Sequence, residues 1–77
     1  MKDLLEYLAK GLVDSPDAVI VDQFEEDDGT IVLELQVADD DVGKVIGRSG
    51  RTVNALRTII RASSVKHRRR VLVDVVD

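Results

Sequence analysis

The sequence contains no cysteine, one proline and only two aromatic residues among its 77 positions. Without cysteine, neither a disulfide nor a thiolate metal site can form, and the chain suits a reducing compartment. Tyr7 and Phe24 are too few to supply the aromatic platforms on which many single-strand binders stack bases. Any nucleic-acid recognition must therefore rely on phosphates, aliphatic side chains and backbone hydrogen bonds.

Long apolar runs are also missing. No stretch approaches the roughly 20 apolar residues that a membrane-spanning helix requires. The first segment, "MKDLLEYLAKGL", carries Asp3 and Glu6 within its apolar pattern, whereas the central region of a signal peptide is uncharged. We therefore expect a cytoplasmic protein without membrane contact. Residues 1–77 are expected to form one domain with a small core, because a chain of this size buries only about 60% of its unfolded surface.

Charge is divided unevenly along the chain. Residues 1–43 carry two lysines against thirteen acidic residues, and residues 44–77 carry nine lysines or arginines against two acidic residues. The net charge of −4 therefore combines an acidic half with a basic half. This asymmetry indicates one surface that binds an anion and another that repels it; the alternative is that the charges only keep a small domain soluble.

Apolar periodicity predicts the element order α-β-β-α-α-β. Helices are expected at 2–13, 41–46 and 51–63, and strands at 18–24, 31–37 and 68–76. The acidic residues at 39–41 supply N-cap candidates for the short helix. Asp28-Gly29 favours an antiparallel hairpin, and the two-helix crossover lets the last strand lie parallel to the second. The predicted fold class is α+β, with a three-stranded mixed sheet covered on one face by three helices.

Two glycines bracket the turn between the second and third predicted helices, in the stretch "VGKVIGRSGRTVNALRTII" from Val42 to Ile60. Glycine permits a tight backbone path that a side chain would obstruct. The N-terminus of the following helix presents unpaired N–H groups and a partial positive charge, which suit a phosphate. The predicted phosphate cradle consists of Lys44, Gly47, Arg48, Ser49, Gly50 and Arg51. The alternative is an ordinary helix–turn–helix corner with solvated arginines.

The segment "VIGRSGRTV", in its β-α-α-β context, resembles the GxxG loop of KH domains, the hnRNP-K-homology RNA-binding modules. The resemblance covers almost the whole chain and implies the type II KH arrangement. Within it, "DVGKVIGRSGRTVNALRTI" looks like the small bacterial single-KH family called KhpA. In KH domains the GxxG loop contacts four nucleotides of a single strand. Matched residue by residue, the loop here is Gly47, Arg48, Ser49 and Gly50.

The resemblance also implies a role and a partner. It implies an RNA-binding protein that acts as an RNA chaperone, pairs with the larger Jag-type KH protein KhpB and is linked to cell-shape and cell-wall regulation. Apolar residues near the loop are candidates for the wall and floor of a base groove, although the same spacing fits a core: Val45 and Ile46, with Leu35 and Val37. The alternative function is a protein-interaction adaptor whose KH surface is mainly a dimerisation module with little RNA binding.

The 51–63 helix carries two apolar stripes where a surface helix usually has one. The stripe expected to face the sheet consists of Val53, Leu56 and Ile60. The second stripe consists of Ala55, Ile59 and Ala62, whose small residues permit close approach of another helix. It is either a homodimer face, as the resemblance to self-associating KhpA-like proteins implies, or the seat of the N-terminal helix or a loop of the same domain.

Patterns that carry catalysis or bind metal are not found. The acidic turn "EEDDG" lacks EF-hand spacing, no P-loop lysine follows the glycines, and His67 is the only histidine. The cluster "KHRRR" at 66–70 either widens the positive field beside a nucleic-acid groove or protects the edge of the last strand. We predict no enzyme activity, no cofactor and no metal, and single-stranded RNA as the ligand.

Overall fold

The computed structural model describes residues 1–65 and 68–76. Its α-helices are α1 (Lys2–Lys10), α2 (Val42–Ile46) and α3 (Arg51–Ser64), and its strands are β1 (Ile20–Glu25), β2 (Ile31–Gln36) and β3 (Val71–Val76). Single turns of 3-10 helix occur at Pro16–Ala18, Asp39–Asp41 and Arg48–Gly50. The predicted order α-β-β-α-α-β is confirmed.

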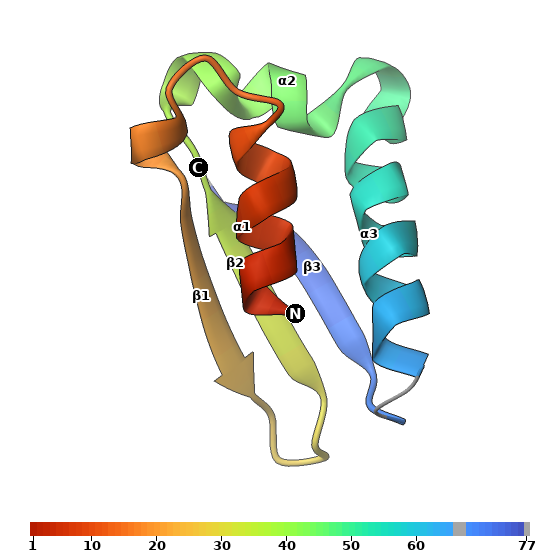
Figure 1. Ribbon diagram of the computed structural model, residues 1–77. Helices are drawn as coiled ribbons and strands as arrows, with labels where there is room; N and C mark the ends of the chain where they lie inside the picture. The colour runs from red at the N-terminus through yellow and green to blue at the C-terminus, as the bar shows by residue number, and fades with distance from the viewer. Residues whose placement is uncertain (66–67, 77) are drawn as a thin grey trace.

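The sheet has the order β1-β2-β3, with β2 in the centre. β1 and β2 form the antiparallel hairpin and β3 runs parallel to β2, so the predicted mixed sheet is confirmed. At the hairpin turn, the backbone N–H of Thr30 donates to Asp28 Oδ1 at 2.9 Å, and this bond lowers the pKa of Asp28. α1 and α3 lie against one face of the sheet, and α2 crosses the end of that layer (Figure 1).

The core fills the space between the sheet and the helices. Alternate residues of β2 point toward the helices, and Leu33 and Leu35 have no exposed surface. The helices contribute Leu5, Ala9, Val45, Leu56 and Ile60 to the same buried cluster. Full burial of such an aliphatic side chain stabilises the fold by roughly 1.5–3 kcal/mol. No helix within the described residues is long and apolar enough to cross a bilayer.

Several helix and strand boundaries in the structure differ from those predicted from the sequence. The first helix ends at Lys10 because the chain turns at Gly11, which is unfavourable inside a helix, and Leu12 lies beyond it with 40% of its surface exposed. β1 starts at Ile20 because the proline-led 3-10 turn occupies the residues just before it. β3 starts at Val71 because Arg68 has a φ of 54°, which an extended strand cannot contain.

Candidate nucleic-acid interface

The turn between α2 and α3 is built on positive φ angles. Gly47 has φ 76° and ψ 174°, Ser49 has φ 56°, and Gly50 has φ 76°. The N–H of Gly47 donates to the carbonyl of Gly43 at 2.9 Å and ends α2, and the N–H of Gly50 donates to the carbonyl of Gly47 at 3.2 Å. This tight path leaves Arg48 and Ser49 exposed at the tip of the loop, immediately before the N-terminus of α3.

The two glycines serve different purposes. A Cβ atom at Gly47 would lie 2.9 Å from the backbone nitrogen of Thr52 and would collide with the threonine side chain as well. Gly47 therefore allows the loop to approach the first turn of α3 closely. At Gly50 the nearest heavy atom to a Cβ would be 3.8 Å away, so that position requires glycine only for its left-handed backbone angle.

The exposed cations of the loop are Arg48 and Arg51. Among the residues that the structure describes, neither forms an ion pair. Lys44, in contrast, pairs with Asp14, and its Nζ lies 3.6 Å from Asp41 Oδ1. The hydrogen bond to Asp14 raises the pKa of Lys44. Two carboxylates therefore balance the charge of Lys44, and the arginines are the stronger candidates for phosphate contact.

Asp41 joins α2 to the segment that follows α1. Its side chain is buried, and its two carboxylate oxygens accept hydrogen bonds from the backbone N–H groups of Asp14 at 3.1 Å and Ser15 at 3.0 Å. Burial raises the pKa of Asp41, but these bonds and Lys44 outweigh it, so the net pKa lies below the usual 3.8. Asp41 stands at the N-cap of α2, as predicted, but its side chain makes no capping hydrogen bond, because its oxygens bind the distant segment instead.

Asp41→Asn is expected to lower the melting temperature at neutral pH by at least about 5 °C, because the amide has one acceptor oxygen for the two N–H groups that the buried carboxylate binds. A carboxyl whose pKa is depressed on folding stabilises the fold above its unfolded pKa and loses that contribution as pH falls through the folded pKa. The difference in melting temperature between wild type and variant should therefore become smaller below about pH 4. Asp40→Asn, which changes an exposed neighbour, is the control. A difference in melting temperature that does not depend on pH would contradict a role for the ionised carboxylate.

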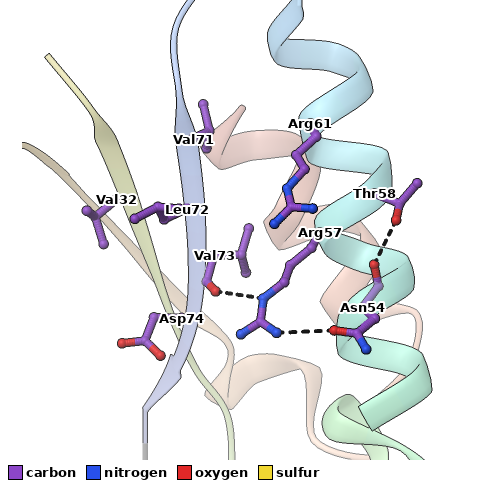
Figure 2. A pocket seen from close by; sticks show the side chains of 9 residues that line it. All are labelled: Val32, Asn54, Arg57, Thr58, Arg61, Val71, Leu72, Val73 and Asp74. Carbon is purple, nitrogen blue, oxygen red and sulfur yellow. Dashed lines mark hydrogen bonds between the residues drawn. The ribbon is translucent and has the colours of Figure 1, made fainter.

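A cleft of about 500 Å³ runs between α3 and the outer edge of β3 (Figure 2). Because β3 is an edge strand, no other strand covers this edge within the described residues. The cleft has Asn54 as its first lining residue on α3, about one helical turn after the GxxG loop. Its lining residues are Val32, Asn54, Arg57, Thr58, Arg61, Val71, Leu72, Val73 and Asp74.

Arg57 bridges the two sides of the cleft. Its Nε donates to the carbonyl of Val73 at 3.1 Å, and its Nη1 donates to Asn54 Oδ1 at 3.2 Å (Figure 2). Arg61 extends from the next turn of α3 toward β3. Since the backbone groups of an edge strand point alternately toward the sheet and away from it, the odd-numbered valines of β3 offer N–H and C=O groups to the cleft. The cleft therefore combines cations, an amide and strand-edge hydrogen-bonding groups.

The predicted wall and floor of the base groove are largely wrong. Val45 and Leu35 have no exposed surface and Val37 has 6%, because all three side chains point into the core. Ile46, which is 38% exposed beside the loop, stays a candidate. Asn54, Arg57 and Arg61 line the cleft but are not among the residues predicted from the sequence. Their spacing of three and four residues along α3 marks a polar stripe, but only the position of β3 shows what that stripe faces.

The second apolar stripe of α3 is open to solvent. Ala55, Ile59 and Ala62 are all exposed, and Ile59 keeps 42% of its surface accessible. The alternative in which the N-terminal helix or a loop of the same domain buries Ile59 is therefore wrong. The dimer face stays a prediction.

The basic cluster is only partly described. Lys66 and His67 lie outside the described residues. Arg69 Nη1 lies 2.9 Å from Glu25 Oε1, so this arginine pairs with the end of β1 rather than facing the cleft. Within residues 1–65 and 68–76, no group of three histidine or acidic residues could hold a metal ion.

Comparison with known proteins identifies the family. The KH domain of the KhpA/KhpB family matches residues 2–75. The chain is 50% identical to "RNA-binding protein KhpA" of Clostridium acetobutylicum over 99% of this chain and all of that protein. It is 50% identical to the protein of that name from Halalkalibacterium halodurans over both full lengths, and 49% identical to that of Streptomyces coelicolor over 97% of this chain and 94% of the relative.

No solved structure matches the chain significantly. The matching family is one of KH domains and not of enzymes. The type II order of elements, the GxxG loop and the full-length similarity lead to one assignment. The chain belongs to the KhpA/KhpB family of KH domains.

Proposed function

We propose that this protein binds single-stranded RNA, with the RNA backbone on the GxxG loop and the bases in the cleft between α3 and β3. The observation that carries the proposal is that the two adjoin: the GxxG loop leads directly into α3, and Asn54, Arg57 and Arg61 of α3 line the cleft. The relatives named as RNA-binding proteins support the same ligand. Base stacking on aromatic rings plays no part, because neither Tyr7 nor Phe24 lines the cleft.

Arg61→Ser is expected to weaken RNA binding by about tenfold, because it removes a cation that extends into the cleft. The measurement is a fluorescence-anisotropy titration of labelled single-stranded oligonucleotides at several salt concentrations. For wild type, the logarithm of affinity should fall with that of salt by about 0.7 per neutralised phosphate, and the variant should show a smaller slope. Lys10→Ser, on the exposed surface of α1, is the control. Equal affinity of all three proteins would contradict the cleft as the RNA site.

Self-association is the second part of the proposal. If the stripe of Ala55, Ile59 and Ala62 pairs two copies, Ile59→Asp would bury a charge against an apolar surface and should shift a dimer to monomer. Light scattering measures the change, and Thr58→Asp, which lies toward the cleft, is the matched control. A wild type that is monomeric at high micromolar concentration would contradict the homodimer.

The resemblance also leads us to propose that the protein acts as an RNA chaperone in the cytoplasm, with a Jag-type KhpB partner and a role in cell-shape and cell-wall regulation. The joint KhpA/KhpB family supports the KhpB part. The exposed stripe on α3 also suits an adaptor with little RNA binding, which is the competing function. RNA crosslinking in cells separates the two, since an adaptor should recover no more RNA than an unrelated acidic protein.

A further inference from the structure

The face of the sheet opposite the helices is not covered by any described element (Figure 1). Side chains alternate along a strand, so the residues between the buried ones lie on this open face. The strand register arranges them in three rows. These rows are Phe24–Val32–Leu72, Asp22–Glu34–Asp74 and Ile20–Gln36–Val76.

Two of the rows expose apolar side chains. Ile20 and Phe24 each keep 50% of their surface exposed and Leu72 keeps 36%, while Val32 and Val76 are half-buried. The single phenylalanine of the chain therefore lies on this face rather than in the core. A solvated sheet face normally carries polar residues, and contiguous exposed apolar surface marks an interaction site.

The middle row carries three carboxylates side by side. The register places Glu34 between Asp22 and Asp74, and like charges in directly opposite positions on neighbouring strands destabilise a sheet. None of the three takes part in an ion pair formed within the described residues. A cation placed over this row would remove the repulsion.

Charge decides what can occupy the face. The phosphates of a nucleic acid lying across the face are repelled by the acidic row, and a second copy of the same face would place three carboxylates opposite three more. We propose that the open sheet face binds an extended, basic segment of a partner protein. Rows on a strand are about 6.6–6.8 Å apart, which equals the spacing of residues i, i+2 and i+4 in an extended chain. The matching segment has the pattern apolar-x-basic-x-apolar, with lysine or arginine over the acidic row.

The test is a titration monitored by the backbone amide resonances of the full chain. The probe is a synthetic peptide with repeated Leu-Ser-Lys-Ser-Leu, and the comparison peptides replace lysine by glutamate or leucine by serine. Val32, Leu72 and Asp74 also border the RNA cleft, so the variants are taken from β1 and β2, away from it. Shifts at Ile20–Glu25 and Ile31–Gln36 are expected with the leucine–lysine peptide.

Asp22→Asn combined with Glu34→Gln should weaken peptide binding at least about tenfold, and Phe24→Ser should weaken it as well. The amide double variant relieves repulsion, so it should fold. The matched control, Asp27→Asn with Asp39→Asn, removes the same charge from exposed sites off this face. The proposal is overturned if both double variants weaken binding equally, if the shifts lie elsewhere, if the glutamate or serine peptide binds as well, or if no binding occurs. Shifts that appear at this face on raising protein concentration alone would assign it to self-association and overturn the proposal too.

Discussion

The variant Gly47→Ala is expected to lose both thermal stability and RNA binding. The glycine has φ 76° and ψ 174°, a backbone region that is almost reserved for glycine, and holding alanine there costs about 1–3 kcal/mol. The added Cβ would also lie 2.9 Å from the backbone nitrogen of Thr52, so the loop must move away from α3. For a domain of this size, thermal melts should show a decrease of about 10 °C or more. RNA affinity should fall as well, because a displaced loop no longer holds its arginines beside the N-terminal N–H groups of α3.

Two other glycines provide matched controls for this change. Gly43 lies inside α2, and a Cβ there would meet nothing within 4 Å, so Gly43→Ala should stabilise the protein by about 0.5–1 kcal/mol. Gly50→Asn keeps a left-handed angle that asparagine tolerates, so its melting temperature should stay close to that of wild type. A Gly47→Ala protein that melts and binds RNA like wild type would show that close packing of the loop against α3 is not required.

The order of elements could be predicted because it depends on local patterns. Alternating apolar residues in 31–37 indicate a half-buried strand, and the positions of Leu33 and Leu35 confirm it. Asp28-Gly29 predicted the hairpin from the dipeptide alone. Boundaries were less predictable, since Leu12 continues the helical spacing while the helix has already ended at Lys10. A glycine such as Gly11 can end a helix where the apolar spacing continues, and the spacing alone does not show at which residue the helix ends.

The candidate site was only partly predictable because its residues depend on tertiary neighbours. Asp41 is 26 positions from Ser15, whose N–H it accepts, and no local pattern connects them. Val45 was expected at the groove wall, but apolar spacing in a five-residue helix does not distinguish a groove from a core. Arg57 and Arg61 are candidates for RNA contact only because β3 lies beside α3 in the fold.

Replacing Arg48 and Ser49 together with aspartate is expected to reduce RNA affinity by at least about tenfold, which is roughly 1.4 kcal/mol. Both residues are exposed at the loop tip, so the fold should tolerate the change. Ser49 has φ 56° and ψ 28°, and aspartate is among the residues that adopt this left-handed conformation most readily. The backbone path is therefore retained while the charge at the tip reverses. The new carboxylates repel a phosphate and can themselves accept hydrogen bonds from the N-terminal N–H groups of α3.

The control for this reversal places the same change of charge away from the loop. Lys2→Asp with Gln23→Asp adds the same negative charge near the N-terminus, which lies far from the turn between α2 and α3 (Figure 1). If general repulsion of RNA by an acidic protein were responsible, both double variants would bind equally poorly. Binding lost only at the loop, with circular dichroism, melting temperature and light scattering unchanged, assigns the phosphate contact to Gly47–Gly50. Unchanged affinity in the folded loop variant would instead transfer the RNA site to the cleft alone or favour the adaptor function.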